Sequence, residues 1–591
     1  MARASDAPAD GAPLDPAQVR VERLLAEAVT ADSLADVPVA LHLDGGERLQ
    51  VVDTFVTVLG GLYSHLPAKR AAYATDPVQA LVLLRRRAVD LTDAEFHLAL
   101  TGILNGLRDA HTRYVGPAAG RGQVATLPFL VEAHGSEQDP HFLVTKVDPR
   151  AAKDRSFVAG VEVVAWNGVP IARAVEVHAD RETGGRPDAR RARALESLTF
   201  RALDYGPPPD EHWVVVEYRT SRGATHETRF DWTVVRPGKA GTAVAKATRT
   251  ALKVAVDPAA DAVRRAKKLT FVPELWATED EPATATTPPA PAPAPARVTR
   301  SATARAQAAD DGRAAPSGRT DGPVDTDWIP TPLQDVLAAR ALDADHGLLR
   351  LWSFDVGDDN AYLDEMVRLL GLLPPGGVIV DLRGNPGGLV WAAERALQLF
   401  GGTHVVPTRF SLVATPLTRL MAASPFNRLE LEAWNSSLQD AVSTGEQYAQ
   451  PLPLTDESWC NDRGRVYPGP AVAVVDPNTY SSGDLFAAGW VDNDVGPLVA
   501  VGQATGGGGA NVWTLSQVRD ALAGTERALA PMPAGTSLTV AVRRTIRSGR
   551  GDGIPVEDLG IAGVPYDMTR DDLLRGNVDL QAFCLGLLRG R

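Results

Sequence analysis

Two stretches near the start of the chain carry apolar residues at the spacing of a helix. They are "DPAQVRVERLLAEAV" at 15–29 and "TDAEFHLALTGILNGLRDAH" at 92–111. Thr92 begins the second stretch, and Glu95 follows three residues later, which is the pattern of a capping box. We therefore predict an N-terminal helical domain over 1–120, with a long amphipathic helix that ends at His111.

The next region alternates apolar and polar residues in short runs, as half-buried strands do. The runs are "HFLVTKVD" at 141–148, "GVEVVAWNG" at 160–168, "HWVVVEYRT" at 212–220 and "ETRFDWTVV" at 227–235. They predict a small β-rich module over 121–236.

The composition changes abruptly at 276–328, where Pro and Ala dominate and large apolar residues are rare. Such a segment cannot bury enough apolar surface to fold, so we predict a disordered, extended linker. Residues 237–275 are intermediate. Their "KLTFVPELW" stretch, which runs on to 276, is apolar enough to dock on the rest of the protein, and it is a candidate autoinhibitory segment.

After 329 the pattern alternates strands and helices. "HGLLRLWSFDV" is followed by "NAYLDEMVRLLGLL", then by "GGVIVDLRGNPGG" and "LVWAAERALQLF". This alternation predicts an α/β layer structure over 329–591.

Composition narrows the possible functions. A chain of 591 residues is long enough for several domains, and its net charge of −13 argues against nucleic acid as a main partner. Cys460 and Cys584 are too few for a disulfide framework or a zinc cluster. We find neither a signal peptide nor a membrane span, so we expect a cytoplasmic protein.

Three segments of the α/β region combine a buried strand with a turn of small residues. They are "VIVDLRGNPGG" at 378–388, "NTYSSGDLFAAGW" at 478–490 and "VAVGQATGGGGANV" at 499–512. The glycine turns lack the Gly-Lys-Ser/Thr ending of a phosphate loop. The serines lie where a strand passes into a helix, which is a common position for a nucleophile.

In this order, the three segments resemble the C-terminal processing, or tail-specific, serine peptidases, whose α/β fold is crotonase-like. "FVAGVEVVAWNGVPI" at 157–171 resembles the PDZ-like domain that precedes the core in such enzymes. The resemblance implies peptide-bond hydrolysis by a serine, with no metal and no organic cofactor.

The base must differ from that of typical family members, which pair the serine with a lysine in the second glycine loop. Here that position is Gly508, and the last lysine of the chain is Lys268. A histidine or a carboxylate must take the proton instead. Within the core the histidines are His346 and His404, and His111 precedes the β-rich module.

The tricorn core protease and the chlamydial protease-like activity factor form the histidine-using branch of this superfamily. Their histidine lies in a stretch similar to "LRDAHTRYV", and their glutamate lies in a segment similar to "GIPVEDLGIAGVPYD". The resemblance therefore implies His111 as the base and Glu557 as its acidic partner, with Asp492 as the alternative acid. The serine that precedes the histidine in tricorn-type enzymes is Ala110 here, so that hydroxyl is missing or is replaced by Thr112.

In the family the nucleophile precedes an acidic helix residue by three positions, which from Asp484 implies Ser481. The oxyanion hole would then use the backbone N–H of Ser482 and that of Gly387, with Gly388 as the alternative.

We thus expect a serine endopeptidase that binds a polypeptide substrate as an extended strand and is activated by self-cleavage in the linker. For the oligomeric state, a homodimer is the alternative to a monomer. The competing hypothesis is a catalytically inactive peptide-binding scaffold of the same fold. An acyl-CoA enzyme would rest on fold analogy alone.

Overall fold

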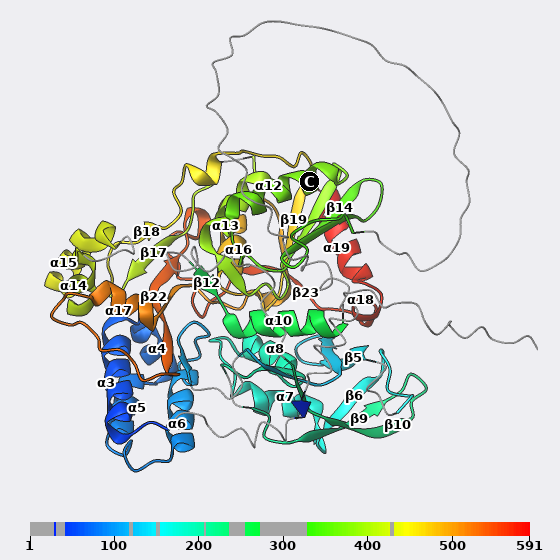
Figure 1. The fold of residues 1–591 in the computed structure, drawn as a ribbon. Helices are drawn as coiled ribbons and strands as arrows, with labels where there is room; N and C mark the ends of the chain where they lie inside the picture. The colour runs from blue at the N-terminus through cyan, green and yellow to red at the C-terminus, as the bar shows by residue number, and fades with distance from the viewer. Residues whose placement is uncertain are drawn as a thin grey trace, which may run out of the picture.

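The computed structural model describes residues 29–30, 42–116, 122–148, 154–205, 208–235, 254–271, 328–402, 404–425 and 431–590. The helix predicted at 15–29 lies outside these residues except for Val29, which forms a short strand with Thr30, and nearly all of the predicted linker lies outside them too. No helix of the described ranges is long and apolar enough to cross a bilayer. Figure 1 shows helices at the N-terminal end, a β-rich module and a large α/β core.

The N-terminal helices share a hydrophobic core with elements from the C-terminal half. The helices are α3 (Gly45–Leu62), α4 (Leu66–Tyr73), α5 (Pro77–Arg85) and α6 (Asp93–Asn105). The predicted capping box is present at α6, where the Thr92 hydroxyl accepts from the Glu95 N–H. Phe55 of α3 belongs to the same buried cluster as Trp434 and Trp513.

The C-terminal elements of this shared core form, together with strand β2, a five-strand sheet with helices around it (Figure 1). The strand order is β18-β17-β22-β2, with β21 also paired to β22. The elements are β2 (Arg113–Val115), β17 (Arg409–Leu412), β18 (Leu452–Pro453), β21 (Ala510–Thr514), β22 (Ser537–Ile546), α14 (Pro416–Ala423), η2 (Glu432–Trp434), α15 (Asn435–Thr444) and α17 (Leu515–Leu522). Strand β2 follows the N-terminal helices directly and pairs with β22. The N-terminal part of the chain is therefore held against the C-terminal part by a shared sheet.

The β-rich module contains the four predicted strand runs. Its larger sheet has the order β10-β9-β6-β5-β4, and a smaller one has the order β1-β11-β3-β8. The elements are β1 (Val29–Thr30), β3 (Val124–Thr126), β4 (Phe129–His134), β5 (His141–Val147), β6 (Glu162–Trp166), β7 (Val169–Pro170), α7 (Ile171–Ala179), α8 (Pro187–Ser197), β8 (Phe200–Ala202), β9 (Trp213–Arg219), β10 (Thr225–Asp231) and β11 (Thr233–Val235). The module packs around its own aromatic cluster.

The α/β core is a six-strand sheet covered on both faces, as the alternating pattern predicts. Its order is β13-β14-β15-β19-β20-β23, and β14, β15, β19 and β20 run parallel. The strands are β13 (Leu337–Ala341), β14 (His346–Leu351), β15 (Gly377–Asp381), β19 (Ala471–Val475), β20 (Leu498–Ala504) and β23 (Ala562–Tyr566). The helices and turns are α12 (Asp359–Leu372), α13 (Val390–Ala396), η1 (Leu397–Leu399), η3 (Trp459–Asn461), α16 (Ser482–Asp492), η4 (Gly549–Gly551), α18 (Arg570–Leu574) and α19 (Val578–Arg589).

The two faces of this sheet have separate clusters because successive strand side chains point to opposite sides. Val378 and Val380 of β15 pack with α12, α13 and α16, whereas Ile379 packs with α19. The turns of the three segments singled out in the sequence, at 378–388, 478–490 and 499–512, follow β15, β19 and β20. They therefore meet at the edge of the sheet where these parallel strands end.

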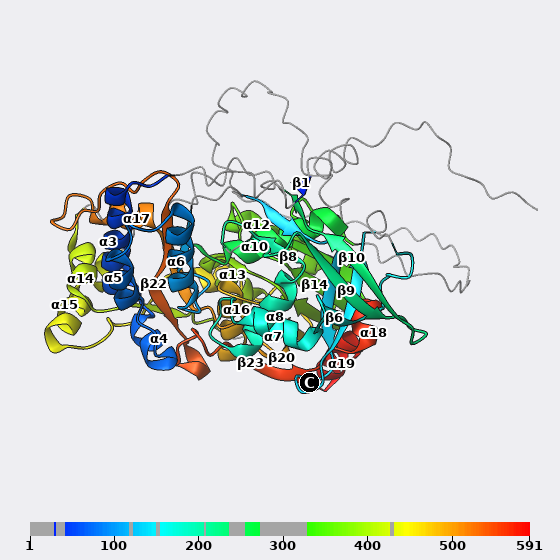
Figure 2. The same ribbon diagram turned by 90° about the horizontal axis from the view of Figure 1, so that it is seen from below.

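A connecting segment lies between the β-rich module and the core. Strand β12 (Val254–Val256) pairs antiparallel with β16 (Gly387–Leu389), and α10 (Pro258–Phe271) follows it. Figure 1 shows α10 running between the two parts, and Figure 2 shows the same arrangement from below. The "KLTFVPELW" stretch is described only up to Phe271, where it forms the end of α10.

Candidate active site

Ser481 lies at the turn from β19 into α16, and its backbone has an unusual conformation. Its φ is 61° and its ψ is −122°, a region that residues other than glycine rarely adopt. The turn is fixed on both sides, since Tyr480 N–H donates to the Asn385 carbonyl at 2.9 Å and Gly483 N–H donates to the Tyr480 carbonyl at 2.9 Å. A strained backbone of this kind persists where the surrounding structure holds it, and it is frequent at active sites.

His111 does not end a helix, contrary to the expectation from its periodic pattern. Helix α6 ends at Asn105, and Arg108 then has a φ of 55°. The left-handed backbone at Arg108 stops the helix. The carboxylate of Asp109 accepts the His111 N–H at 2.8 Å, which orders the turn before β2. His111 is therefore held by a tight loop and by the pairing of β2 with β22.

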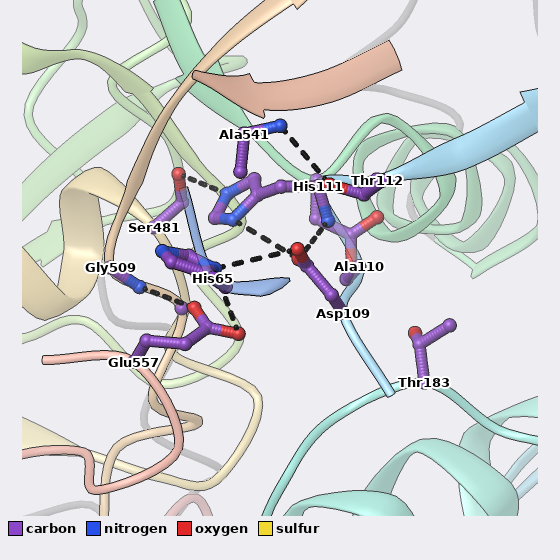
Figure 3. A network of polar contacts seen from close by, with 12 residues as sticks. His65, Asp109, Ala110, His111, Thr112, Thr183, Ser481, Gly509, Ala541 and Glu557 are labelled. Carbon is purple, nitrogen blue, oxygen red and sulfur yellow. Dashed lines mark hydrogen bonds and ion pairs between the residues drawn. The ribbon is translucent and has the colours of Figure 1, made fainter. Parts of the chain in front are cut away.

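The structure brings Ser481 and His111 together although 370 positions separate them. His111 Nε2 lies 2.8 Å from Ser481 Oγ (Figure 3). The Tyr480 ring packs against the imidazole, with ring centroids 4.8 Å apart. This contact aligns a basic nitrogen with the hydroxyl proton that it would remove.

Burial lowers the pKa of His111, and the nearby carboxylates of Asp109, Glu557 and Asp257 offset part of that shift. The neutral imidazole is thus favoured at neutral pH, as a general base requires. Its Nδ1 has no hydrogen-bond partner among the described residues, and Asp109 Oδ1 lies 3.8 Å away.

Glu557 lies near the imidazole of His65 rather than that of His111. Its Oε1 is 2.7 Å from Lys69 Nζ and 3.5 Å from His65 Nδ1, and its Oε2 accepts the Gly509 N–H at 3.1 Å. Asp109 Oδ2 is also 3.5 Å from His65 Nδ1. His65 therefore lies between the two carboxylates, as Figure 3 shows.

The charges of this buried cluster favour a protonated His65. Burial alone would lower the pKa of His65, but Glu557 and Asp109 raise it to about 9. The pKa of Glu557 is lowered despite burial, because His65 and Lys69 are beside it. The result is a row of alternating charges that leads from Lys69 through Glu557 and His65 to Asp109.

The ligand atoms of His65, Asp109 and Glu557 lie within 4.8 Å of one another, which is close enough to hold a metal ion. The Lys69 ammonium group already supplies a cation at Glu557, and Asp558 accepts a hydrogen bond from it at 2.6 Å. A metal would have to compete with these buried pairs, so we assign the cluster to hydrogen bonding and charge pairing.

The predicted oxyanion-hole residues lie on α16, which begins directly after Ser481, and on β16, which contacts α16. Ser482 is the first residue of α16, and its hydroxyl donates to the Gly388 carbonyl at 2.9 Å. The Gly387 N–H donates to Asn385 Oδ1 at 2.8 Å, so this donor already has a partner. Gly388 has a φ of 149°, and a Cβ there would lie 1.8 Å from the Phe354 carbonyl carbon, which explains why position 388 must be glycine.

Asp484 holds the second glycine loop against the nucleophile. Its carboxylate accepts the N–H groups of Gly507 and Gly508 at 3.0 and 2.9 Å and the hydroxyl of Thr505. Burial raises the pKa of Asp484 to about 6, although these donors act in the opposite direction. In the sequence, this residue served only to locate the nucleophile.

The alternative residues lie in other surroundings. His346 Nδ1 is 2.9 Å from Asp343, and the exposed His404 is 2.5 Å from Glu457. Asp492 accepts from Arg547 Nε at 2.9 Å.

The hydroxyl of Thr112, the suggested substitute for the missing serine, accepts the Ala541 N–H at 3.1 Å. This bond secures β22 beside the histidine loop.

Asp109 and His65 are site residues that the sequence interpretation missed. Asp109 stands two positions before His111 in "RDAH", so its proximity to the histidine was a usable signal. His65 and Lys69 lie on the turn into α4 and on α4 itself, more than forty residues upstream, and no spacing in the sequence connects them with the site.

Comparison with known families identifies two domains. Residues 345–554 match the model of peptidase family S41, and residues 123–239 match a PDZ domain model. The first range contains Ser481 and both glycine loops, and the second coincides with the β-rich module.

Comparison with solved structures extends the likeness over nearly the whole chain. Mature CPAF is 16% identical with a TM-score of 0.58, and the alignment covers 90% of this chain and 94% of that one. Mature CPAF complexed with lactacystin is 15% identical with a TM-score of 0.59, covering 93% and 99%. At these identities the likeness establishes the fold, including its helical N-terminal part and its PDZ-like domain. No curated protein matches in sequence.

Proposed function

We propose that this chain, a serine-type peptidase with a family S41 domain behind a PDZ domain, is an endopeptidase that works through an acyl-enzyme intermediate. The observation that carries the proposal is the 2.8 Å contact between Ser481 Oγ and His111 Nε2. The imidazole takes the hydroxyl proton while Oγ bonds to the substrate carbonyl carbon.

The tetrahedral intermediate carries a negative oxygen, which backbone N–H groups at Ser482 and Gly388 would stabilise. The Gly387 N–H is already bonded to Asn385, whereas Gly388 stands opposite Ala255 of β12 and becomes accessible when β12 leaves, so we take Gly388 as the second donor. His111 then gives its proton to the leaving amine, and water releases the acyl group by the same steps.

The acidic part of the proposed Ser481–His111–Glu557 triad acts through intermediate groups. Protonation of His111 at Nε2 places a positive charge 3.8 Å from Asp109, measured at Nδ1. Asp109 is in turn paired with the His65 imidazole, and Glu557 supports the charge on His65. Opposite charges at such distances in a buried site stabilise one another more strongly than in water.

Substrate would pair as an extended strand with β16, because that is how β12 is bound in this structure. The PDZ domain offers a second sheet edge to which a peptide strand could pair. Strand β4 ends its sheet, and together with α8 it lines a cavity of about 1580 Å³ that continues to the peptidase core. A peptide could add to β4 while its continuation reaches the core.

The described conformation is closed. The side chains of Ser481 and His111 are buried, and β12 covers β16. We propose that self-cleavage between about Ala277 and Asp327 frees this segment and opens the site. A tethered linker would meet the active site at a high effective concentration.

The test follows wild-type and Ser481→Ala protein by mass spectrometry during incubation, together with hydrolysis of an unfolded protein substrate. Nicking in the linker and substrate hydrolysis should both occur in the wild type and both be absent from Ser481→Ala. Nicking of Ser481→Ala at the same rate would assign the cut to another protease. A wild type that binds peptides but never cleaves any would favour the inactive scaffold.

A further inference from the structure

The segment that covers the active site ends in a buried acidic side chain. The Asp257 N–H donates to the Pro386 carbonyl at 2.9 Å, which continues the pairing of β12 with β16 by one residue. Asp257 has no exposed surface. Its carboxylate therefore lies beside the "NPGG" turn, where an extended substrate would place one of its own side chains.

Two arginines from different parts of the chain face this carboxylate. Arg193 of α8 places Nη1 2.5 Å from Asp257 Oδ2, and Arg113 of β2 places Nη2 3.7 Å from Asp257 Oδ1. Both arginines are more than nine-tenths buried. Arg193 Nε has no hydrogen-bond partner among the described residues, so the guanidinium retains an unused donor.

The arginines are connected to the catalytic groups. The guanidinium of Arg193 lies over the Tyr480 ring, 4.6 Å from its centroid, and Tyr480 packs on His111. Arg113 Nε donates to the Ala110 carbonyl at 2.9 Å, next to His111 in the chain. The pair of positive charges is thus part of the wall of the active site.

A purely structural role explains only part of this arrangement. The Asp257 carboxylate caps α10, since it accepts the N–H groups of Ala259 and Ala260 at 3.0 and 3.3 Å. A cap needs no cation, whereas burying two guanidinium groups carries a large desolvation cost that a carboxylate must offset. When β12 leaves, Arg193 loses its closest ion-pair partner and faces the opened site.

We propose that Arg193 and Arg113 form a subsite for a substrate carboxylate, and that Asp257 occupies it as a substrate mimic. This inference rests on the proposed function and deepens it, because it names acidic peptides as the preferred substrates. The carboxylate can come from an Asp or Glu side chain or from the C-terminus of a peptide. A planar, forked guanidinium suits either source.

Binding is measured first, in Ser481→Ala protein, so that catalysis plays no part and an added peptide must compete with the β12 segment, which stays attached because this protein cannot cut itself. Three fluorescent peptides are compared. The first copies the segment "VAVDP". The second carries Asn in place of Asp, and the third has neutral side chains but a free C-terminal carboxylate. Adding Asp257→Asn removes the mimic and should tighten binding of the acidic peptide about tenfold or more, without a similar gain for the neutral peptide. Further addition of Arg193→Gln should abolish the difference.

Cleavage is measured second, with self-processed wild-type enzyme and the same peptides. The ratio of kcat/KM for acidic over neutral peptides should be about ten or more, and Arg193→Gln should bring it near one. Equal binding and equal cleavage of acidic and neutral peptides would overturn the subsite while leaving the peptidase intact. Loss of all cleavage with retained acidic preference in binding would instead contradict the proposed function. If Arg193→Gln does not fold, the wild-type preference and the Asp257→Asn effect still decide.

Discussion

The Tyr480 ring fills the space beside Gly508. A Cβ at position 508 would lie 2.1 Å from Tyr480 Cζ, so no side chain fits there. This is the position at which typical members of the resembled family carry their lysine. The ring that excludes a side chain here also packs on the His111 imidazole. Tyr480 therefore links the absence of a side chain at position 508 to the placement of the histidine.

Gly508→Ala should destabilise the protein by about 1–3 kcal/mol and greatly reduce activity, because the new methyl group must displace Tyr480 and with it His111. Gly371→Ala is the matched control. Gly371 lies in α12, and a Cβ there meets nothing within 4 Å. Thermal unfolding should give a lower Tm for the first variant and an unchanged or slightly higher Tm for the second. Equal Tm values would show that the ring moves aside freely.

The two serines should differ sharply in their effect on turnover. Ser481→Ala should lose on the order of 10⁶ in kcat, as a triad nucleophile does. Ser482→Ala keeps the backbone N–H and removes the bond from its hydroxyl to the Gly388 carbonyl, worth roughly 1 kcal/mol. Its loss in kcat should therefore be about five- to tenfold. Similar losses in steady-state assays of the two variants would assign the nucleophile to the wrong serine.

The two carboxylates should rank by their distance from His111. Asp109→Asn keeps the oxygen that accepts the His111 N–H but removes the charge nearest the imidazole, so kcat should fall by up to about 10⁴. Glu557→Gln acts through His65 and should cost less. Steady-state kinetics of both variants, with circular dichroism to confirm folding, measure this order. The reverse order would mean that Glu557 approaches His111 directly in the active form.

Much of the architecture could be predicted from the sequence because apolar periodicity determines which face of each element is buried. The alternation of strands and helices in the α/β core and the four strand runs of the β-rich module are examples. The pairing of Ser481 with His111 was inferred from family resemblance, since no local pattern connects residues 370 positions apart. The role of His65 was not predictable in this way. Its proximity to Glu557 arises only when α4 packs against the C-terminal segment.

The end of α6 shows a different limit of periodicity. Apolar residues continue at helical spacing towards His111, but the backbone of Arg108 is left-handed and the Asp109 carboxylate accepts the N–H of His111. Local side-chain bonds of this kind compete with the helix. The pattern of burial therefore persisted beyond the point at which the helix stopped.

Activity should decline at acid pH with the titration of His111. Burial lowers the pKa of His111. At a pH above this lowered pKa the imidazole is neutral and can act as a base, and at a pH below it the imidazole is protonated and cannot. The midpoint of the acid limb should accordingly lie below 6.5, the usual value for histidine. The profile of kcat/KM against pH measures this for the free enzyme. Asp109→Asn removes a charge that raises this pKa and should move the midpoint lower still, whereas a midpoint at or above 6.5 would contradict a buried base.

The most direct test of the account is to label the self-processed protein with a fluorophosphonate probe and map the modified residue by mass spectrometry. The probe reacts with a serine only when a base activates it and an oxyanion site accepts the phosphoryl oxygen. The account predicts one modified residue, Ser481, with labelling abolished in Ser481→Ala and in His111→Ala and retained in His404→Ala, whose exposed histidine lies elsewhere. Labelling of a different serine, or of Ser481 at an unchanged rate in His111→Ala, would contradict it.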